Sequence, residues 1–480
     1  MSLEEAFDPQ RFRSLGHRWV DLLSGYLEQA SGESEMPVLP VVPPAGMLDL
    51  VESGFSTEPN EDLLERLASL IAHSNHLHHR HYMGHQVATV LPQAALIEAT
   101  NALLNNGMAV YEMGQMQTVM EHRVVQFLNR LLGFPDNAGG VLTHGGSIGN
   151  LTALLAARQA KAGCDVWTEG HTEKYAVLVS EQAHYCVARA VQIMGWGAAG
   201  AVAVETDDEF RVTRESLERG FASARESGRK VLAVVASSCT TATGSFDPLM
   251  EVADFCSEHD LWLHVDGAHG ASLAFSSAHR DRLRGIDRAD SVVWDLHKLA
   301  LMPGLITAVL FRDNRRSYEA FAQEASYLFE PVDQQTECFD VGRRTLECTK
   351  RGLGALSFIL IQTHGTRLFG ESVDLLIQRT RELAEMVTEE EDMEVATYPE
   401  ANILCFRLLS RSEMNTNELN ARLRTKLVDS GYFYIVQTQL RGVLWLRVAM
   451  MNPATKREDL RELLQRLKEL AVSEGGAIPS

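Results

Sequence analysis

The chain lacks the features that mark membrane and secreted proteins. No apolar run in its 480 residues reaches the roughly 18 residues that a membrane-spanning helix needs. Residues 1–10 are acidic and do not show the basic-then-apolar layout of a secretory signal peptide. The seven cysteines form an odd, dispersed set, which predicts reduced thiols and neither a disulfide framework nor a zinc site. We therefore expect a cytoplasmic protein with no membrane partner.

Positive charge is also scarce. The chain has 44 basic and 64 acidic residues, which gives a formal net charge of −20 at pH 7. This acidic balance favours solubility and argues against nucleic acid or an anionic membrane surface as a partner. The sequence has no internal repeat and no low-complexity tract.

The content of hydrophobic residues, 45%, and the length allow large buried cores in two or three domains. Residues 1–60 hold a single amphipathic stretch, 11–29, followed by a connector rich in proline and valine at 36–44. Helical periodicity then predicts helices over 93–106 and 119–132, and a glycine ends each of them.

From about residue 151, short apolar runs alternate with amphipathic segments of helix length. This alternation predicts the α/β class, with a largely parallel sheet covered by helices on both faces. The predicted strands are 176–179, 231–235, 261–265, 291–294 and 307–311, and the predicted helices include 151–161 and 248–258.

A different pattern follows in the last third of the chain. A long helix near 345–363 is expected to leave the sheet domain. Beyond it, a smaller α+β domain is predicted from strands at 403–408, 432–436 and 444–448 and a closing helix at 456–470.

Lys298 directly follows a predicted strand and precedes an apolar run. Burial in such surroundings lowers the pKa of a lysine toward the range where a neutral amine can attack a carbonyl. Taken alone, this motif fits a lysine that snorkels at a strand end equally well.

Asp266 lies just past the strand 261–265, at the edge where open α/β sheets place ligand contacts. Pyridoxal phosphate (PLP) needs a carboxylate that keeps its pyridine nitrogen protonated, so that the ring can accept electrons when a bond at Cα breaks. An aspartate that only caps a helix is the ordinary alternative.

Residues 143–150 are rich in glycine and lead directly into a predicted helix. Gly146 lets the backbone approach an anion, the helix start offers free N–H groups, and Ser147 adds a hydroxyl. The segment lacks the Gly-Lys-Ser/Thr ending of a P-loop, so an NTPase is not expected. A plain glycine-rich turn is the alternative.

Two further segments follow strands. His184 comes after 176–179 and can stack on a planar ring or simply begin a helix, and the hydroxyl-rich segment 238–244 comes after 231–235. Each motif alone is modest. Together, a phosphate cradle, a stacking group, a hydroxyl loop, an aspartate and a lysine occur in this order at successive strand ends.

This ordered set resembles the fold-type I, PLP-dependent group II amino-acid decarboxylases, with the Asp-x-His-Lys segment at 295–304 as its most specific piece. The resemblance runs from about Ser74 to Pro453. It implies a PLP-dependent transferase-like large domain with a mainly parallel seven-stranded sheet at 61–345. A linking helix and small C-terminal α+β domain would occupy 346–480, and an N-terminal helical segment, 1–60, would pack on the partner subunit of a homodimer.

The resemblance also implies roles for single residues. Lys298 would form the Schiff base with PLP, Asp266 would pair with the pyridine nitrogen, and His184 would stack on the ring. The other cofactor contacts that it implies are Gly146, Ser147, Thr241, Ala268 and His297. Tyr327, 29 residues after Lys298, matches a loop tyrosine of the family that would protonate Cα after CO2 leaves. A core aromatic is the alternative for Tyr327.

The expected substrate contacts are Arg447, Tyr82 and His85. Arg447 lies in a segment that resembles the one whose arginine binds the substrate carboxylate, although an inter-domain salt bridge would also explain it. Tyr82 and His85 follow a stretch that departs from the family's His-Pro-Arg pattern, because Arg80 replaces the proline and His81 the arginine. The resemblance therefore leaves the substrate class open.

Five histidines crowd the same stretch, at positions 76, 78, 79, 81 and 85. Their spacing, with no carboxylate placed among them, does not fit a metal site, so no metal is expected.

We expect a decarboxylase that converts an L-amino acid to its amine and CO2. The segment 325–329 leans toward an acidic substrate such as glutamate, aspartate or cysteine sulfinate, while an aromatic or diaminobutyrate substrate stays open. An aldehyde-forming oxidative variant is disfavoured by the presence of Tyr327. An inactive PLP-fold scaffold is disfavoured by Lys298 and Asp266.

Overall fold

The structure, a computed structural model, describes residues 2–32, 36–51, 54–55, 57, 62–321, 339–410 and 414–474. It divides into two compact units. The sheet unit comprises Gln86–Thr380 and Thr397–Ile403, and the terminal unit comprises Met1–His85, Arg381–Ala396 and Leu404–Ser480. These bounds differ from the predicted ranges 1–60, 61–345 and 346–480, which stay a prediction about the assembled protein.

The sheet unit is built on a seven-stranded sheet with the order β1-β7-β6-β5-β4-β2-β3. The strands are β1 (Gly139–Thr143), β2 (Tyr175–Ser180), β3 (Ala201–Val204), β4 (Lys230–Ser237), β5 (Trp262–Asp266), β6 (Ser291–Asp295) and β7 (Thr307–Phe311). The neighbours from β3 to β6 pair in parallel, whereas β7 is antiparallel to both β6 and β1. The mainly parallel sheet expected from the sequence is therefore confirmed.

The apolar runs of the sequence predict five of the seven strands of this sheet. Every residue of β2, β6 and β7 is buried, and each of these strands matches a predicted apolar run. The strands β1 and β3 are not among the predicted strands, although every residue of β1 is buried and β3 reads Ala-Val-Ala-Val; only Val204 of β3 is buried.

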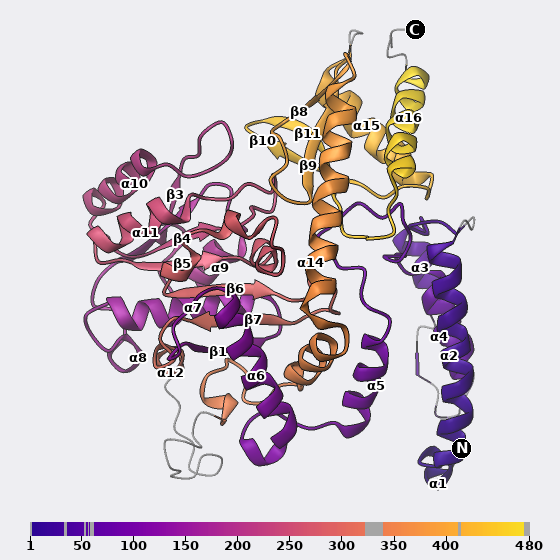
Figure 1. Cartoon of the computed structure of the whole chain (residues 1–480), viewed down its shortest axis with the longest axis horizontal. Helices are drawn as coiled ribbons and strands as arrows, with labels where there is room; N and C mark the ends of the chain where they lie inside the picture. The colour runs from indigo at the N-terminus through magenta and orange to yellow at the C-terminus, as the bar shows by residue number, and fades with distance from the viewer. Residues whose placement is uncertain are drawn as a thin grey trace. The chain divides into compact units, whose positions relative to one another are not determined.

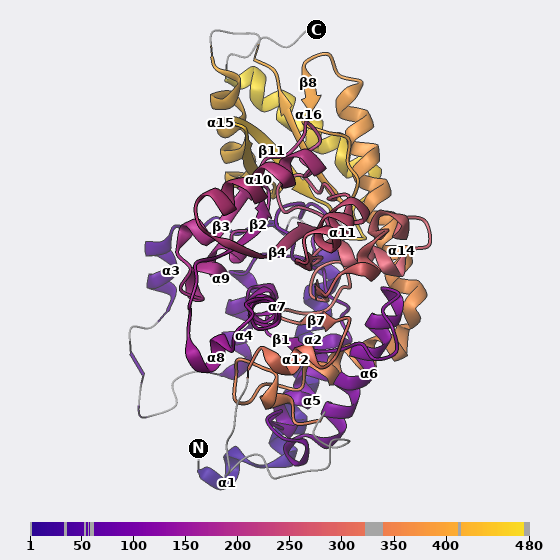
Figure 2. The ribbon, with the colours of Figure 1, turned by 90° about the vertical axis from the view of Figure 1, so that its left-hand side faces the viewer.

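Helices cover both faces of this sheet. The face that carries α7 (Gly146–Lys161) also carries α9 (Cys186–Ile193), and the opposite face carries α10 (Arg214–Glu226) and α11 (Leu249–Glu258) (Figure 2). Right-handed crossovers between parallel strands require this division, because the strand order reverses after β3. The helix α6 (Gln115–Leu131) packs on β1 and β7.

The long helix α14 (Leu353–Thr388) begins later than predicted. The preceding residues are held by other bonds: Tyr111 N–H donates to the Asp340 carboxylate at 3.1 Å, and Gly342 N–H donates to the Ala109 carbonyl at 2.8 Å. The predicted start at 345 is therefore wrong. Non-helical backbone at Gly365, with φ of 70°, interrupts the helix.

The terminal unit has a four-stranded sheet with the order β10-β11-β9-β8. Its elements are β8 (Met393–Val395), β9 (Ile403–Leu408), α15 (Thr416–Asp429), β10 (Val436–Leu440), β11 (Val443–Ala449) and α16 (Arg457–Ser473). The strand predicted at 432–436 is wrong, because regular pairing begins only at Val436. Tyr434 makes an isolated bridge with Tyr82 instead.

The N-terminal helices of the terminal unit expose much apolar surface. They are α1 (Leu3–Ala6), α2 (Pro9–Ser31), α3 (Pro44–Leu50) and α4 (Leu63–Ala72). Helices α2 and α4 lie side by side (Figure 1), yet Ala30 is the only buried residue of α2. The remaining helices are α5 (Ala94–Leu104), α8 (Val166–Glu169) and α12 (Arg316–Glu319). Among the helices of the described residues, none combines the length and apolarity that crossing a bilayer requires.

Candidate active site

A cavity of about 290 Å³ opens in the sheet unit where the parallel strands end. Its walls come from the segments directly after β1, β2, β4, β5 and β6, the edge at which open α/β sheets bind ligands. The eight residues predicted to contact the cofactor all line it: Gly146, Ser147, His184, Thr241, Asp266, Ala268, His297 and Lys298. The structure thus brings together residues that are spread over more than 150 positions of the sequence.

Lys298 reaches the cavity from the turn after β6. Its Nζ lies 3.1 Å from Asp295 Oδ2, and 20% of its side chain is exposed. Burial acts to lower the pKa of Lys298, but the carboxylates of Asp295 and Asp266 outweigh burial and raise this pKa above its ordinary value. The expectation of a lowered pKa is therefore wrong in sign, because two carboxylates converge on the amine.

Asp266 ends β5 and borders the cavity. Its Oδ1 accepts a hydrogen bond from the Ala268 N–H at 3.1 Å. Burial raises the pKa of Asp266, and the positive charge of Lys298 opposes this effect. A carboxylate in this place can pair with a cationic ring nitrogen, which would keep it ionised.

The turn from β1 into α7 has the geometry of an anion cradle. Gly145 precedes the helix with φ of 95°, a left-handed conformation that favours glycine, and no side chain caps the first turn. The N–H groups of the first turn, including Gly146 and Ser147, are thus available to a ligand. A Cβ added at Gly146 would lie 3.2 Å from the Asp295 carboxylate oxygens, a tight contact that favours glycine here.

His184 borders the cavity from the end of β2, and His297 borders it from the turn after β6, beside Lys298. The Nδ1 of His184 accepts a hydrogen bond from the Cys186 N–H at 3.3 Å, and burial lowers the pKa of His184. The Nδ1 of His297 lies 2.9 Å from the Ile306 carbonyl. Since each ring is held by a backbone group, both can present a fixed face or edge to a ligand.

Sequence reasoning missed several residues that line the same cavity, namely His144, Asn150, Cys186, Cys239, His269 and Asp295. Asp295 had the clearest signal, because it opens the Asp-x-His-Lys segment. Its carboxylate accepts a hydrogen bond from the Thr307 hydroxyl and pairs with Lys298.

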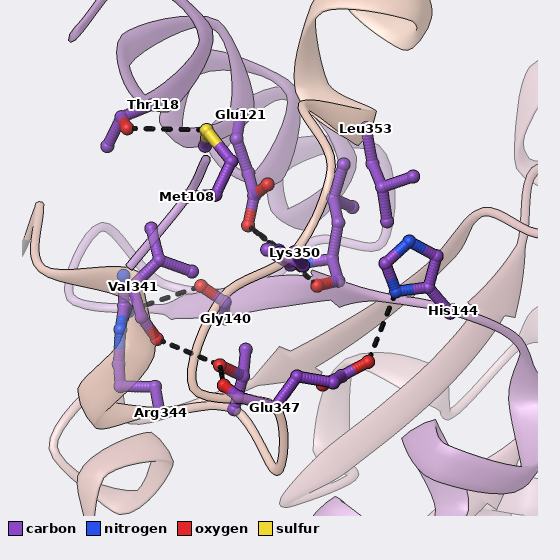
Figure 3. A network of polar contacts seen from close by, with 12 residues as sticks. Met108, Thr118, Glu121, Gly140, His144, Val341, Arg344, Glu347, Lys350 and Leu353 are labelled. Atoms are coloured by element: carbon purple, nitrogen blue, oxygen red, sulfur yellow. Dashed lines mark hydrogen bonds and ion pairs between the residues drawn. The ribbon is translucent and has the colours of Figure 1, made fainter. Parts of the chain in front are cut away.

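A polar network braces β1 behind the cavity (Figure 3). The Nδ1 of His144, at the cavity wall, lies 3.1 Å from Glu347 Oε1. In the same network the Nζ of Lys350 lies 2.6 Å from Glu121 Oε1, and it also donates to the Leu142 carbonyl. The side chain of Lys350 is fully buried, and burial lowers its pKa despite the nearby Glu121. Lys350 is therefore a buried lysine that pairs with a carboxylate but does not line the cavity.

The three residues predicted to bind substrate lie in the terminal unit, where they share one neighbourhood. The rings of Tyr82 and Tyr434 stack with centroids 5.3 Å apart, and His85 lies 5.9 Å from the same Tyr434 ring. Partial burial, then the positive charges of Arg447 and Arg424, lower the pKa of His85. Burial raises the pKa of Tyr82 to about 12.

Arg80 and His81, the departures from the family pattern, point toward α16. Arg80 Nε lies 3.2 Å and His81 Nε2 3.3 Å from Asp459 Oδ1, and the His81 ring stacks on Phe433 at 4.1 Å. With Glu462, His81 and Asp459 form the one group in the described part of the chain whose potential ligand atoms lie within 4.8 Å of one another. The Arg80 guanidinium already forms an ion pair with the Asp459 carboxylate, and this positive charge disfavours a metal ion there.

Tyr327, the predicted proton donor, lies outside the described residues. Its role therefore stays a prediction.

Comparison with known proteins adds an independent finding. Residues 44–409 match the family described as "Pyridoxal-dependent decarboxylase conserved domain". The chain is 27% identical to the aromatic-L-amino-acid decarboxylase of Bacillus atrophaeus over 98% of both chains. It is 29% identical to the cysteine sulfinic acid decarboxylase of Rattus norvegicus over 88% of both. The crystal structure of mouse CSAD matches with a TM-score of 0.89 at 26% identity, covering 96% of this chain and 99% of that one.

Proposed function

Because this chain belongs to the family of pyridoxal-dependent decarboxylases, we propose that its strand-end cavity decarboxylates an L-amino acid, with Lys298 holding the cofactor. The enzyme is a PLP-dependent carboxy-lyase. One observation carries the proposed site: three strand ends, those of β6, β5 and β1, bring Lys298, Asp266 and the cradle at Gly146 and Ser147 to the walls of a single cavity.

The donor set of the cavity fits PLP group by group. Lys298 offers an amine for the aldehyde, Asp266 a carboxylate for the ring nitrogen, and the start of α7 offers N–H groups for the phosphate. His184 and Ala268 would flank the ring, while Thr241, after β4, and His297, beside Lys298, would also contact the cofactor. When bound, PLP supplies an electron sink for the bond that breaks at Cα.

The side chains of this protein then have distinct tasks. Asp266 holds a proton at the ring nitrogen, because a buried carboxylate favours a cation beside it. Lys298, paired with Asp295 at 3.1 Å, keeps its amine close to the position that the aldehyde must occupy. Arg447 would bind the substrate carboxylate and orient the bond to be broken.

Tyr327 would deliver a proton to Cα after CO2 leaves. Tyr327→Phe removes only a hydroxyl, so cofactor binding should be unchanged while amine formation slows and the aldehyde-to-amine product ratio rises. Quantifying both products in the presence of oxygen tests this role. A product ratio equal to that of the unmodified enzyme would contradict it.

For the substrate we propose an acidic amino acid: glutamate, aspartate or cysteine sulfinate. The support is the positive charge of Arg447 and Arg424 that acts on His85, since a side-chain carboxylate is stabilised near such groups. The stacked rings of Tyr82 and Tyr434 favour a second candidate, an aromatic substrate packed against them. A diaminobutyrate substrate would place a second cation beside the arginines and is disfavoured on that ground.

A panel of L-amino acids assayed for CO2 release tests the proposal. The panel contains glutamate, aspartate, cysteine sulfinate, tryptophan, tyrosine and 2,4-diaminobutyrate. Release of CO2 with the acidic members supports the proposed substrate class, and release with only the aromatic members replaces it with the second candidate. Peroxide and ammonia formed together with CO2 would identify the oxidative variant. No turnover and no cofactor absorbance would identify an inactive scaffold.

We also propose a homodimer in the cytoplasm. Helix α2 and its flanks expose Phe7 and Phe12 to 81% and 64%, and α5 exposes Leu103 to 71%. Apolar surface of this extent is stabilised when a second copy covers it. Sedimentation velocity tests the dimer, and a fully active monomer would overturn it. The cytoplasmic location rests on the sequence alone.

A further inference from the structure

A chain of buried polar side chains runs away from Asp266 beneath α7. Asn150 Nδ2 lies 3.4 Å from Asp266 Oδ2, and Asn150 Oδ1 lies 2.9 Å from His264 Nε2. His264 Nδ1 lies 2.9 Å from the Ser291 hydroxyl, which lies 2.9 Å from Trp262 Nε1. Apart from Asp266, which borders the cavity, every member is exposed by 2% or less.

The sequence places these groups on one face of the sheet. Trp262, His264 and Asp266 alternate along β5, so their side chains point to the same side. Ser291, the first residue of β6, pairs directly with His264. Asn150 comes down from α7, the helix that covers this face.

The orientation of Asn150 follows from its partners. Its Nδ2 lies 2.9 Å from the Gly146 carbonyl as well as close to the Asp266 carboxylate, and both of these groups only accept hydrogen bonds. The amide nitrogen must therefore face them, which turns Oδ1 toward His264. An amide oxygen only accepts, so His264 Nε2 must carry a proton.

The donor and the acceptor of each remaining hydrogen bond in this row of side chains are then determined. Burial, only partly offset by the backbone of Ser291, lowers the pKa of His264 to about 4, so the ring is neutral at pH 7. Its Nδ1 is then an acceptor and receives a hydrogen bond from the Ser291 hydroxyl. The indole of Trp262, which only donates, binds the Ser291 oxygen. Every group thus has one defined role.

This row of hydrogen bonds ends on the carboxylate of Asp266, the group proposed to face the ring nitrogen of PLP. Asn150 also bonds the Gly146 carbonyl, in the turn proposed to hold the phosphate. One amide therefore links the two ends of the proposed cofactor site, and His264 prevents that amide from turning over.

We propose that Asn150 is a positioning residue. Its orientation is fixed by His264 and Ser291, and its amide keeps Asp266 ionised and holds the Asp266 carboxylate at a fixed distance from the turn at Gly146. This inference rests on the role proposed above for Asp266. It assigns a function to Asn150 at the cavity wall and to His264 and Ser291, which do not line the cavity.

The first test is the protonation pattern of His264 in the unmodified holoenzyme. Nitrogen-15 NMR of histidine-labelled protein, with His264 assigned through backbone correlations, reports which ring nitrogen carries a proton. We expect a neutral ring protonated at Nε2 throughout pH 6 to 8. A ring protonated at Nδ1, or at both nitrogens at pH 7, would overturn the inference without any variant being made.

The second test compares Asn150→Ala with Asn129→Ala. Asn129 is an equally buried asparagine of the same unit, 3% exposed, whose Nδ2 donates to the Gly139 carbonyl at 3.2 Å away from the cavity. Loss of Asn150 should weaken PLP binding by about tenfold, the effect of one hydrogen bond to a charged group. Asn129→Ala should bind PLP as the unmodified chain does, even if it is less stable.

The pH dependence of PLP binding separates positioning from simple loss of stability. Removing a hydrogen-bond donor from the Asp266 carboxylate raises the pKa of Asp266. The acid limb, that is, the loss of PLP affinity as the pH falls, should therefore begin about one pH unit higher in Asn150→Ala than in the unmodified chain. The other ionisable groups near Asp266 (Lys298, Asp295, His184 and Cys186) are unchanged in both variants. Ser291→Ala, which frees His264 to turn, should give a smaller shift in the same direction.

Asp266→Asn distinguishes failure of the inference from failure of the proposed site. If Asp266→Asn alters the acid limb while Asn150→Ala and Ser291→Ala do not, the inference fails and the role of Asp266 stands. If none of the three variants alters it, the role of Asp266 fails as well.

Discussion

In the described part of the sheet unit, the amines of Lys298 and Lys350 each pair with a buried carboxylate, and their surroundings separate a reactive amine from a structural one. Lys350 has a side chain exposed by 0%, bonds Glu121 and a carbonyl of β1, and has a pKa lowered by burial. Lys298 keeps 20% of its side chain exposed, and the carboxylates of Asp295 and Asp266 raise its pKa. Burial and a carboxylate partner therefore do not identify a cofactor lysine.

What distinguishes Lys298 is access. Its amine opens into a cavity that also holds a second carboxylate, Asp266, and an anion cradle at the start of α7. The amine of Lys350 faces only protein, and its hydrogen bonds tie α6 to β1 (Figure 3). A ligand in the cavity can thus replace Asp295 as the partner of the Lys298 amine. No ligand can reach the Lys350 amine to replace Glu121 in the same way.

The largest expected effect is that of Lys298→Ala. It should abolish both the absorbance of the bound cofactor and CO2 release, because no other amine of the described residues lines the cavity. The unfolding midpoint in urea should also fall, because the buried Asp295 carboxylate loses its cation. Absorbance spectra and CO2 assays of the purified variant check this, and residual turnover above about 1% would contradict the assignment.

Lys350→Ala should have the opposite profile. It leaves the Glu121 carboxylate buried without its cation, which costs about 3–5 kcal/mol of unfolding free energy. The protein that remains folded should still bind PLP. Urea unfolding measures the loss. As a control, Lys350→Met combined with Glu121→Leu should recover most of the stability, because an apolar pair needs no charge partner.

The carboxylates near the two lysines, Asp266 and Glu121, should differ in the same way as the lysines do. Asp266→Asn should retain some PLP but lower turnover on the order of 100-fold, since a neutral amide does not hold the ring nitrogen protonated. Glu121→Gln, the matched change beside Lys350, should leave turnover per folded molecule near that of the unmodified enzyme. Equal turnover in the two variants would remove the distinction between the two lysine sites.

Asp295→Asn should give the smallest of these effects. Loss of a negative charge 3.1 Å from Lys298 lowers the pKa of the lysine, because a nearby anion favours the ammonium form. The neutral amine is then present at lower pH, so the rate of PLP attachment should begin to rise about one pH unit earlier. Stopped-flow absorbance across pH measures this. A shift toward higher pH would contradict the assigned sign.

The cavity could be predicted because its residues follow apolar strands. Asp266 comes after β5 and Lys298 after β6, and parallel strands end at one edge of a sheet. The sign of the pKa shift at Lys298 could not be predicted, since it depends on carboxylates that meet only in the folded chain. The row of hydrogen bonds that links Asp266 to Trp262 could not be predicted from the sequence either, because Asn150 and His264 are 114 positions apart.

The errors in the fold have similar causes. The helix α14 starts later than its apolar pattern suggests, because Asp340 and Gly342 bond to residues near 110. Tyr432 to Ile435 look like a strand but contact the segment near Tyr82. In each case partners distant in sequence overrode a local pattern.

The central claim is that Lys298, and not another buried lysine, holds the cofactor. Borohydride reduction of the PLP-loaded enzyme, followed by proteolysis and mass spectrometry, locates the modified lysine directly. The account predicts a pyridoxyl group on the peptide that contains Lys298 and an unmodified peptide that contains Lys350. A pyridoxyl group on Lys350, or on any lysine other than Lys298, would contradict it.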